Sequence, residues 1–358
     1  MPLTIIDIAR EAGVSKSTVS LVINNSQSVK TETRHRVEQV INRLGYVPNQ
    51  AARQLIMNRS HTLGLIFLTS NHFTKAYDFS SVPETLLYDV SVGINRELTN
   101  TDYTLLTERF SMTEDRTVLP RIVSKRRLEG IVFVGGLITD EFIEQVKEMK
   151  IPLLLIGRQY KGTDSVFVDV EKAGYMGVRY LLEKGHRNIL FVNGPETNPN
   201  SYLKKIGVEA AVREMRAARP TIRIVHSGYA GLDAYKAIKG YWKNSVKLSH
   251  GKQPSAVFCG SDGIAGGIMR FLYEKGLHVP GDISVVSTEY SLLSEYISPR
   301  LTSVDWQKEI LGREACRILL NRINKPGART INLKIPPILV EQDSVRSFNT
   351  PTPLLKAR

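Results

Sequence analysis

The sequence predicts a small all-α module followed by a larger α/β domain that contains two parallel sheets. The first 60 or so residues show only helical apolar periodicity. After about residue 61, short apolar runs alternate with amphipathic stretches of roughly 10 to 15 residues. Strands that alternate with helices form βαβ units, whose parallel sheets are covered on both faces. We therefore place a domain boundary near residues 58–61.

Three short helices are expected in the first module. Thr4 and Asp7 begin the first helix with a pattern like a capping box, and Gly13 suits its left-handed end. Ser15 can cap the second helix, and the third is expected from about Thr31 to Leu44. Each helix has one apolar face, so the three share a small core made of Ile5, Ile8, Ala9, Ala12, Val19, Val22, Ile23, Val37, Val40, Ile41 and Leu44.

The larger domain is expected to contain about nine strands, which divide naturally into two sheets. The strand candidates are Leu63–Leu68, Tyr103–Thr107, Gly130–Val134, Pro152–Ile156, Ser165–Val168, Asn188–Val192, Ile222–Val225, Ser255–Cys259 and Ile283–Ser287. The helix candidates are Glu84–Leu98, Glu114–Lys125, Asp140–Met149, Lys172–Glu183, Ser201–Arg216, Leu232–Trp242 and Asp262–Glu274. The last residues, 349–358, are spaced by prolines and are expected to fray.

The charge balance favours a polyanionic partner. Lys and Arg number 48 against 35 Asp and Glu, which gives a net charge of +13. Residues 1–60 hold eight of the basic and four of the acidic residues, so the positive charge is not confined to one module. No run of 18 apolar residues occurs, and the first ten residues carry no signal-peptide core, so we expect a cytoplasmic protein without membrane contact.

Metal, cofactor and catalytic motifs are not recognisable in this sequence. The two cysteines, Cys259 and Cys316, have no zinc-ligand or disulfide spacing, so we expect no metal site and no cofactor. The seven histidines form no HExxH pattern, and His186 is interpreted as a helix C-terminal residue favoured by the helix dipole. No nucleophile elbow is present, so no enzyme is expected.

The first two helices are spaced like a helix-turn-helix. In that motif the second helix lies in the major groove of DNA, so its outward residues face bases and phosphates. Those residues are Lys16, Ser17, Thr18, Ser20 and Leu21. The alternative interpretation is a plain three-helix bundle whose small polar residues are merely solvated.

A family resemblance favours the first interpretation. The stretches TIIDIAREAGVSKSTVSLVINN and VKTETRHRVEQVINRLGYVPNQAARQL resemble the lactose-repressor/galactose-repressor (LacI/GalR) family of bacterial transcriptional regulators. The segment Tyr46–Leu55 resembles that family's hinge helix, in which a leucine, here Leu55, is wedged into the DNA minor groove beside Ala52. The alternative for Leu55 is a linker leucine that packs on the large domain. The resemblance implies these DNA-contacting residues: Thr4, Ser15, Lys16, Ser17, Thr18, Ser20, Leu21, Asn24, Tyr46, Asn49, Ala52 and Leu55.

One departure from the family pattern concerns base recognition. Leu21 stands where many relatives carry an arginine that reads guanine. Leucine has no hydrogen-bond donor and can contact only apolar groups such as a thymine methyl, so the operator sequence is expected to differ.

The resemblance extends through VDVEKAGYMGVRYLLEKGHRNILFVNGP, PSAVFCGSDGIAGGIMRFLYEKGLHVPGDISVV and SPRLTSV to about residue 345. It implies a periplasmic-binding-protein-like domain of two doubly wound lobes with a ligand cleft at the carboxyl ends of the strands. The implied division is a DNA-binding domain (1–47), a hinge and linker (48–61), an effector and dimerisation domain (62–345) and a tail (346–358). The lobes would be about 62–160 with 293–326, and 161–292 with 327–345.

Matching positions imply the residues that bind the effector: Tyr88, Arg158, Asp169, Lys204, Ser261, Asp262, Glu289 and Trp306. As alternatives, Asp262 and Asp169 could cap the helices that follow them, and Arg158 and Trp306 could pack at the lobe interface. Lys204, Glu289 and Trp306 also replace the family's common arginine, aspartate and glutamine, and lysine lacks the planar fork of arginine. The segment 70–88 is longer than usual and adjoins the cleft. A small-molecule effector is therefore expected, a sugar or sugar derivative by analogy.

The implied function is a regulator, most simply a repressor, that binds a pseudo-palindromic operator in double-stranded DNA as a homodimer. No leucine heptad follows Glu341, so we expect a dimer without a tetramerisation tail. The main alternative is a cytoplasmic sugar-binding protein without specific DNA recognition, and a carbohydrate-active enzyme is a weaker one.

Overall fold

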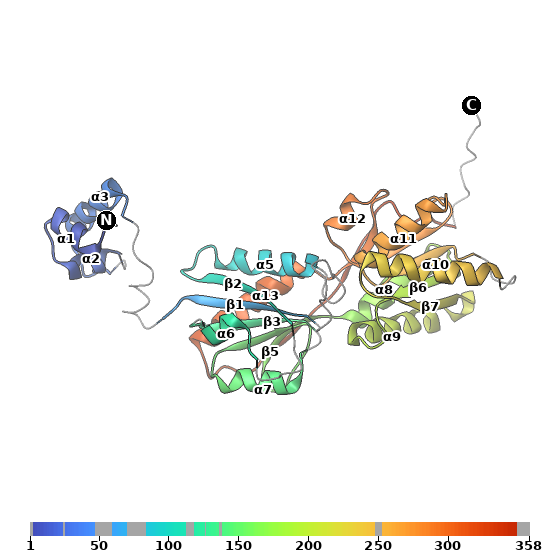
Figure 1. The fold of residues 1–358 in the computed structure, drawn as a ribbon, viewed down its shortest axis with the longest axis horizontal. Coiled ribbons are helices and arrows are strands. Elements are labelled where there is room, and N and C mark those ends of the chain that lie inside the picture. Colours follow the sequence, from blue (N-terminus) through green and yellow to red (C-terminus); the bar gives the residue numbers. More distant parts are fainter. Residues whose placement is uncertain are drawn as a thin grey trace, which may run out of the picture. The chain divides into compact units, whose positions relative to one another are not determined.

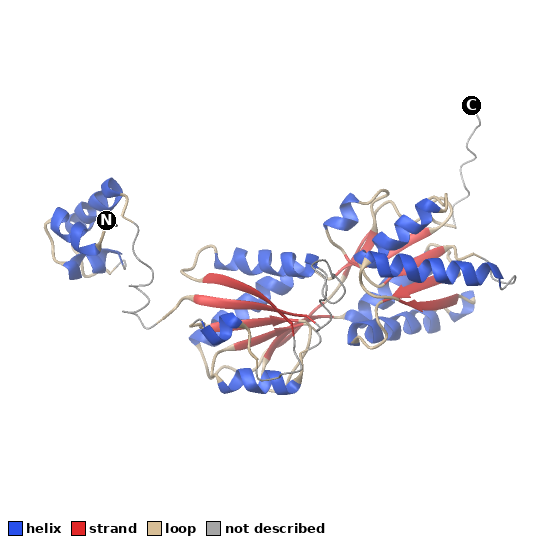
Figure 2. Cartoon of the chain, viewed as in Figure 1, coloured by secondary structure: helices blue, strands red, loops and turns tan. Residues whose placement is uncertain are grey.

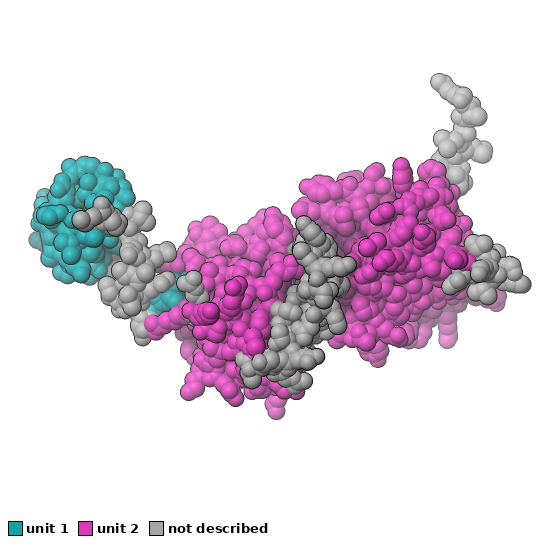
Figure 3. Space-filling view, in the orientation of Figure 1, with its two compact units in different colours: residues 1–61 teal, residues 62–358 magenta. Residues whose placement is uncertain are grey.

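The chain folds into two compact units that meet in sequence at His61 and Thr62, as the sequence predicts (Figure 3). The computed structural model describes residues 3–23, 26–46, 59–69, 84–111, 118–125, 127–135, 138–247 and 253–348. The predicted frayed end, 349–358, and most of the segment 70–88 lie outside the described residues.

The first unit contains the three predicted helices, α1 (Ile5–Ala12), α2 (Lys16–Ile23) and α3 (Thr31–Leu44) (Figure 1). The backbone N–H of Thr4 donates to Asp7 Oδ2 at 2.9 Å, which fixes the start of α1. Gly13 ends α1 at φ 64°, in the left-handed region that favours glycine. The apolar faces meet in one core, whose buried members are Ile8, Ala9, Ala12, Val19, Val22, Val37, Val40 and Tyr46.

The second unit contains two six-stranded sheets (Figure 2). The first sheet is wholly parallel, with the order β11-β5-β4-β3-β1-β2. Its strands are β1 (Thr62–Thr69), β2 (Thr104–Ser111), β3 (Gly130–Val134), β4 (Leu153–Ile156), β5 (Asp164–Val168) and β11 (Asn332–Ile335). Its helices are α5 (Glu84–Leu98), α6 (Arg121–Lys125), α7 (Asp140–Glu148) and α13 (Lys308–Asn324).

The second sheet has the order β12-β10-β9-β8-β6-β7 and is parallel except for β12, which runs antiparallel to β10. Its strands are β6 (Asn188–Asn193), β7 (Thr221–His226), β8 (Ala256–Cys259), β9 (Ser284–Glu289), β10 (Thr302–Asp305) and β12 (Ile338–Val340). The associated helices are α8 (Val170–Glu183), α9 (Pro199–Glu214), α10 (Gly231–Lys247), α11 (Asp262–Glu274), α12 (Leu292–Tyr296) and a short 3-10 turn, Arg216–Ala218.

Helices cover both faces of each sheet (Figure 1). In β1, Leu65 and Phe67 pack with α5 and α13, whereas Ile66 and Leu68 pack on the other face with α6 and α7. In the second sheet, β6 likewise divides its side chains between one core shared with α10 and α11 and another shared with α8 and α9. The predicted fold class, a helical module plus two α/β lobes, is therefore confirmed.

The expected lobe bounds need three changes. β5 belongs to the first sheet, although residues 161–292 were expected in the second lobe. β10 belongs to the second sheet, although 293–326 is expected in the first lobe. β11 belongs to the first sheet, although 327–345 is expected in the second lobe. The chain therefore crosses between lobes three times, between β5 and β6, between β10 and α13, and between β11 and β12.

One local interpretation was wrong. His186 is fully buried, its Nε2 donates to the carbonyl of Arg346 at 3.1 Å, and its Nδ1 lies 3.0 Å from Ser255 Oγ. Burial lowers the pKa of His186 to about 4, so the ring is neutral at physiological pH. A neutral ring gains little from a helix dipole, and the residue holds the segment around Arg346 instead.

Candidate functional site

The outward face of α2 is the candidate DNA-reading surface. Lys16, Ser17 and Leu21 are exposed, and Leu21 keeps 42% of its surface in solvent. Thr18 and Ser20 are half-buried, whereas Val19 and Val22 of α2 are buried in the helical core. An exposed leucine on a polar helix face is available for apolar contact with a base edge.

Three other predicted DNA-contacting residues have structural roles in this unit. Ser15 caps α2, because its Oγ accepts the backbone N–H of Thr18 at 3.1 Å. The Thr4 hydroxyl donates to Asp7 Oδ2 at 2.7 Å. Tyr46 is 9% exposed and belongs to the core. The remaining predicted contacts, Asn24, Asn49, Ala52 and Leu55, lie outside the described residues.

In the second unit, the carboxyl ends of the strands carry a group of buried charged side chains. The centre is Lys204 on α9, which is fully buried. Its Nζ donates to the carbonyl of Gly260, directly after β8. The same ammonium lies 5.4 Å from the ring centroid of Tyr229 and 5.5 Å from that of Trp306. Two aromatic faces thus hold a cation at the end of the sheet, where open α/β sheets bind ligands.

Glu289 ends β9 and supplies the opposite charge. It is 5% exposed, and burial raises its pKa to about 7, although the charges of Lys204 and Lys308 act against that rise. Burial also lowers the pKa of Lys204 to about 8. The Glu289 carboxylate lies within the electrostatic reach of Lys204 and Lys308. Its oxygens are acceptors, so this group is suited to receive a donor from a ligand.

Backbone conformation at this point is unusual. Glu289 and Tyr290 have φ values of 93° and 41°, and Gln307, just after β10, has 53°. Non-glycine residues rarely adopt such values, and they persist where surrounding structure holds them. These three residues therefore show that the surrounding structure holds the backbone at the ends of β9 and β10 in an energetically unfavourable conformation.

Trp306 contributes a free hydrogen-bond donor. The residue is 5% exposed, and its indole Nε1 is buried without a partner among the described residues. A buried N–H left unpaired costs stability, so a ligand acceptor there would relieve the cost. The ring also packs with Val168 and Val304.

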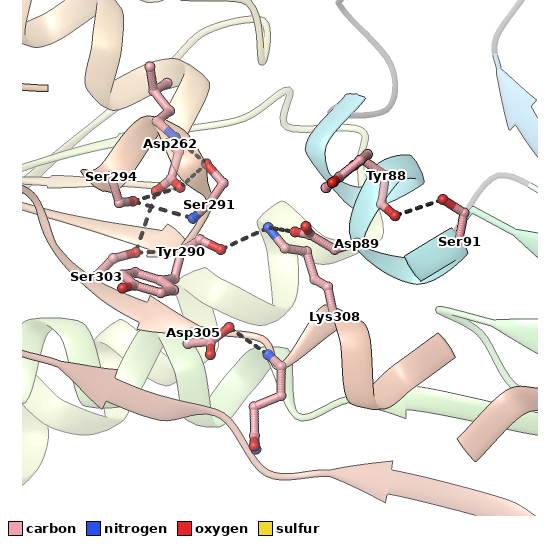
Figure 4. Close-up of polar contacts among 12 residues, drawn as sticks. Tyr88, Asp89, Ser91, Asp262, Tyr290, Ser291, Ser294, Ser303, Asp305 and Lys308 are labelled. Carbon is pink, nitrogen blue, oxygen red and sulfur yellow. Dashed lines mark hydrogen bonds and ion pairs between the residues drawn. The ribbon is translucent and has the colours of Figure 1, made fainter. Parts of the chain in front are cut away.

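Asp262 has a different role from the one predicted. Its carboxylate accepts the hydroxyls of Ser287 and Ser291 at 2.6 Å each, of Ser294 at 2.8 Å and of Ser303 at 3.4 Å. The contacts with Ser291, Ser294 and Ser303 tie α11 to α12 and β10 (Figure 4). The contact with Ser287 ties α11 to β9. The carboxylate is therefore occupied by the protein. The cap of α11 is Ser261, whose Oγ accepts the N–H of Ile264 at 3.2 Å.

Lys308 links the two lobes. Its side chain is 2% exposed, and its Nζ forms an ion pair with Asp89 on α5 at 3.1 Å. The same Nζ donates to the carbonyl of Tyr290 at 2.9 Å (Figure 4). α5 and α13 belong to the first lobe, whereas Tyr290 follows β9 in the second. One ammonium thus joins both lobes beside Glu289.

The other predicted effector residues lie outside this group. Arg158 pairs with Asp140 at 2.6 Å within the first lobe. Asp169 caps α8 by accepting the N–H of Lys172 at 3.0 Å, which confirms the capping alternative. Tyr88 on α5 is 60% exposed.

The group brings together Lys204, Glu289 and Trp306, which the sequence predicts as effector residues, with Lys308, Asp89 and Tyr229, which it does not. Asp89 falls inside a predicted helix and Tyr229 in a loop, and neither belongs to a motif. Lys308 follows Trp306 by two residues, and this proximity was the available signal, because no helix was predicted over Lys308–Asn324. Among the described residues, no group of three or more His, Cys, Asp or Glu could hold a metal ion. No helix in the described ranges is long and apolar enough to cross a bilayer.

Comparisons with known proteins agree with both units. The model for bacterial regulatory proteins of the lacI family matches residues 4–49, and the model for a periplasmic binding protein-like domain matches residues 178–345. The catabolite control protein A of Priestia megaterium is 30% identical, over 94% of this chain and 97% of the relative. The HTH-type transcriptional repressor PurR of Vibrio atlanticus is 29% identical, over 97% and 99%.

Solved structures share the fold. A lac repressor dimer bound to operator and an anti-inducer has a TM-score of 0.76 at 22% identity, covering 97% of this chain and 100% of that one. A complex of the transcriptional regulator CelR with cellobiose has a TM-score of 0.66 at 24% identity, covering 96% and 99%. Since a relative is 30% identical along nearly the whole chain and the family model matches its first helices, the protein belongs to the lacI family of bacterial regulatory proteins and is a DNA-binding transcriptional regulator, not an enzyme.

Proposed function

We propose that this protein is a cytoplasmic, homodimeric repressor of a pseudo-palindromic operator. Its affinity for the operator changes when a sugar or sugar derivative binds the group formed by Lys204, Glu289 and Trp306. Two-fold symmetry of the protein requires two matching half-sites in the DNA, because one recognition helix carries little specificity alone. The exposed face of α2, with Lys16, Ser17 and Leu21, would read each half-site.

The observation that carries the effector proposal is the unsatisfied polar chemistry beside two aromatic rings. Glu289 offers acceptor oxygens, Trp306 offers an N–H, and the Lys204 ammonium has three donors of which the Gly260 carbonyl takes one. A polyhydroxylated ligand can satisfy all three groups, and its apolar ring face can stack on an aromatic side chain. The cellobiose complex of CelR, a protein of the same fold, has a ligand of this class.

Lys308 couples effector binding to DNA affinity in this proposal. A ligand that contacts Glu289 also alters the surroundings of Tyr290, whose carbonyl Lys308 binds. A change in that contact would shift the angle between lobes and thereby the segment 48–61, which is attached to the first lobe. Such coupling is typically about 1 to 3 kcal/mol.

The DNA part is tested by selecting duplexes from a random pool with the full chain. We expect an enriched sequence with two-fold symmetry. Leu21→Arg should change the preferred base at one position of each half-site, by about 1 to 3 kcal/mol. Leu232→Arg is the matched control, because Leu232 is exposed on α10 in the other unit and the substitution adds the same charge. Failure to enrich any sequence would favour the alternative, a sugar-binding protein without specific DNA recognition.

The effector part is tested by thermal shift with glucose, ribose and cellobiose, followed by titration calorimetry of any sugar that stabilises the protein. Trp306→Phe keeps an aromatic ring at this position but removes the indole N–H, so affinity should fall about tenfold. Trp242→Phe is the control, because Trp242 packs against Phe271 in the core beside α10 and α11. Equal affinity in the two variants would remove Trp306 from the site.

A further inference from the structure

A cavity in the first lobe lies apart from the site described above. Its volume is about 310 Å³, within the range of small-ligand sites. It is formed where α7 ends, where β4 and β5 begin and where α13 ends. In a parallel sheet, the starts of these strands share one edge with the start of β1. The cavity therefore lies at the edge by which the chain enters this unit, whereas Arg158 and Asp169 follow the opposite ends of β4 and β5.

The cavity wall has an excess of positive charge. Its single carboxylate, Asp164, is 3% exposed and is held by Arg322, whose Nε and Nη2 donate at 2.8 and 2.9 Å. The backbone N–H of Ile331 donates to the same carboxylate at 2.8 Å. Asp164 and Arg322 thus neutralise each other, and Lys147 and Lys150 leave a net positive charge.

The ammonium groups of both lysines that line the cavity are available to bind a ligand. Lys150 is exposed and has no ion-pair partner in the part of the chain that the structure describes. It also stands at φ 56° after the end of α7, a position for which glycine is the usual residue. Lys147 pairs with Glu144 at 2.9 Å, but both side chains are a third to a half exposed, and such pairs are weak.

An independent observation points to a ligand at the same wall. Thr163 lines the cavity, is 4% exposed, and its buried Oγ1 has no hydrogen-bond partner among the described residues. Unpaired buried hydroxyls are uncommon because the lost hydration is not regained. Thr163, Lys147 and Lys150 line the same cavity, and a wall with a hydroxyl and two ammonium groups matches the acceptor oxygens of an oxyanion.

We propose that this cavity is a second ligand site and that it binds a small phosphate monoester. The phosphate oxygens accept from Lys150, Lys147 and Thr163, and the organic part lies on the apolar wall that includes Ile151 and Pro152. The site lies at the edge of the first sheet at which β1 also begins. This site is distinct from the proposed effector site, and none of its lining residues is shared with the group around Lys204.

The test uses titration calorimetry on the full chain with inorganic phosphate and glycerol 3-phosphate, at constant ionic strength, and with glycerol as the uncharged probe. Saturable binding is expected for the two anions and not for glycerol. Lys150→Gln and Thr163→Val should each weaken binding about tenfold, since each removes one hydrogen bond to a charged group. Lys150 is exposed and valine matches threonine in shape, so both variants should fold.

Two controls separate this proposal from its alternatives. Lys236→Gln removes an exposed lysine on α10 and should leave anion binding unchanged. Trp306→Phe should also leave it unchanged, because that residue belongs to the proposed effector site. The proposal would be overturned if neither anion bound saturably. It would also be overturned if the affinity for the anions were equal in Lys150→Gln, Thr163→Val and Lys236→Gln, or if Trp306→Phe lost anion binding.

Discussion

Replacing Lys308 by methionine should weaken the second unit by about 2 kcal/mol. Methionine keeps the apolar stem but removes the ammonium, which is 2% exposed and lies 3.1 Å from Asp89 and 2.9 Å from the Tyr290 carbonyl. A hydrogen bond from a charged donor is worth about 1.5 to 3 kcal/mol. Loss of one partner of a buried ion pair costs about 3 to 5 kcal/mol, but the Asp89 side chain is 26% exposed and can be rehydrated, which reduces the cost.

The measurement is urea unfolding followed by tryptophan fluorescence, because both tryptophans of the chain lie in this unit. Lys334→Met is the matched control: its pair with Asp169 is longer, at 3.4 Å, and the lysine is 57% exposed. We expect the control to change stability by less than about 0.5 kcal/mol. A cycle with Asp89→Asn should give a coupling of about 1 kcal/mol. Equal effects of the two lysine variants, or no coupling, would refute the reasoning that burial makes this contact strong.

Three further predictions concern titration, packing and DNA binding. His186 is neutral when folded, with a pKa of about 4, so the unfolded chain takes up its proton first as the pH falls. The free energy of unfolding should therefore fall by about 2 to 3 kcal/mol between pH 7 and pH 4, and His186→Gln should reduce that slope in denaturant titrations at each pH. Gly312→Ala would place a Cβ 2.2 Å from the backbone oxygen of Val90 and should destabilise the lobe by about 1 to 3 kcal/mol, whereas Gly240→Ala, which meets no atom within 4 Å, should not; equal melting temperatures would contradict this. Leu55→Ala should weaken operator binding in a gel-shift titration and leave effector binding unchanged, and an unaltered operator affinity would mean that residue 55 is not the minor-groove wedge.

Hydrophobic pattern predicted most of the regular elements. Gly130–Val134, Glu84–Leu98 and Asp262–Glu274 coincide with the observed β3, α5 and α11. These segments have either a continuous apolar run or a clear helical period, which local sequence shows directly. The same reasoning missed β10, β11 and β12, because strands of three or four residues are too short to show a recognisable run, and β10 and β11 also contain polar residues. It also named no helix over Lys308–Asn324, the element that carries the link between lobes.

The site was predicted in part for a related reason. Lys204, Glu289 and Trp306 follow motifs, and the structure brings Lys204 and Trp306 into contact and places the charge of Glu289 beside them. Asp262 also follows a motif, but sequence could not indicate that several serine hydroxyls from other elements occupy its carboxylate. The partners of a polar group decide whether it is free for a ligand, and they come from distant parts of the chain.

The sequence by itself determined the two units, the helix-turn-helix pattern, the alternation of strands and helices, and the family. Each of these depends on spacing within a few tens of residues. Only the tertiary structure decided which strands join which sheet, that Lys308 connects the lobes, and that Thr163 and Trp306 keep buried donors without partners among the residues that the structure describes. The physical reason is that burial and hydrogen bonding are set by contacts between segments far apart in the chain, and no local pattern records them.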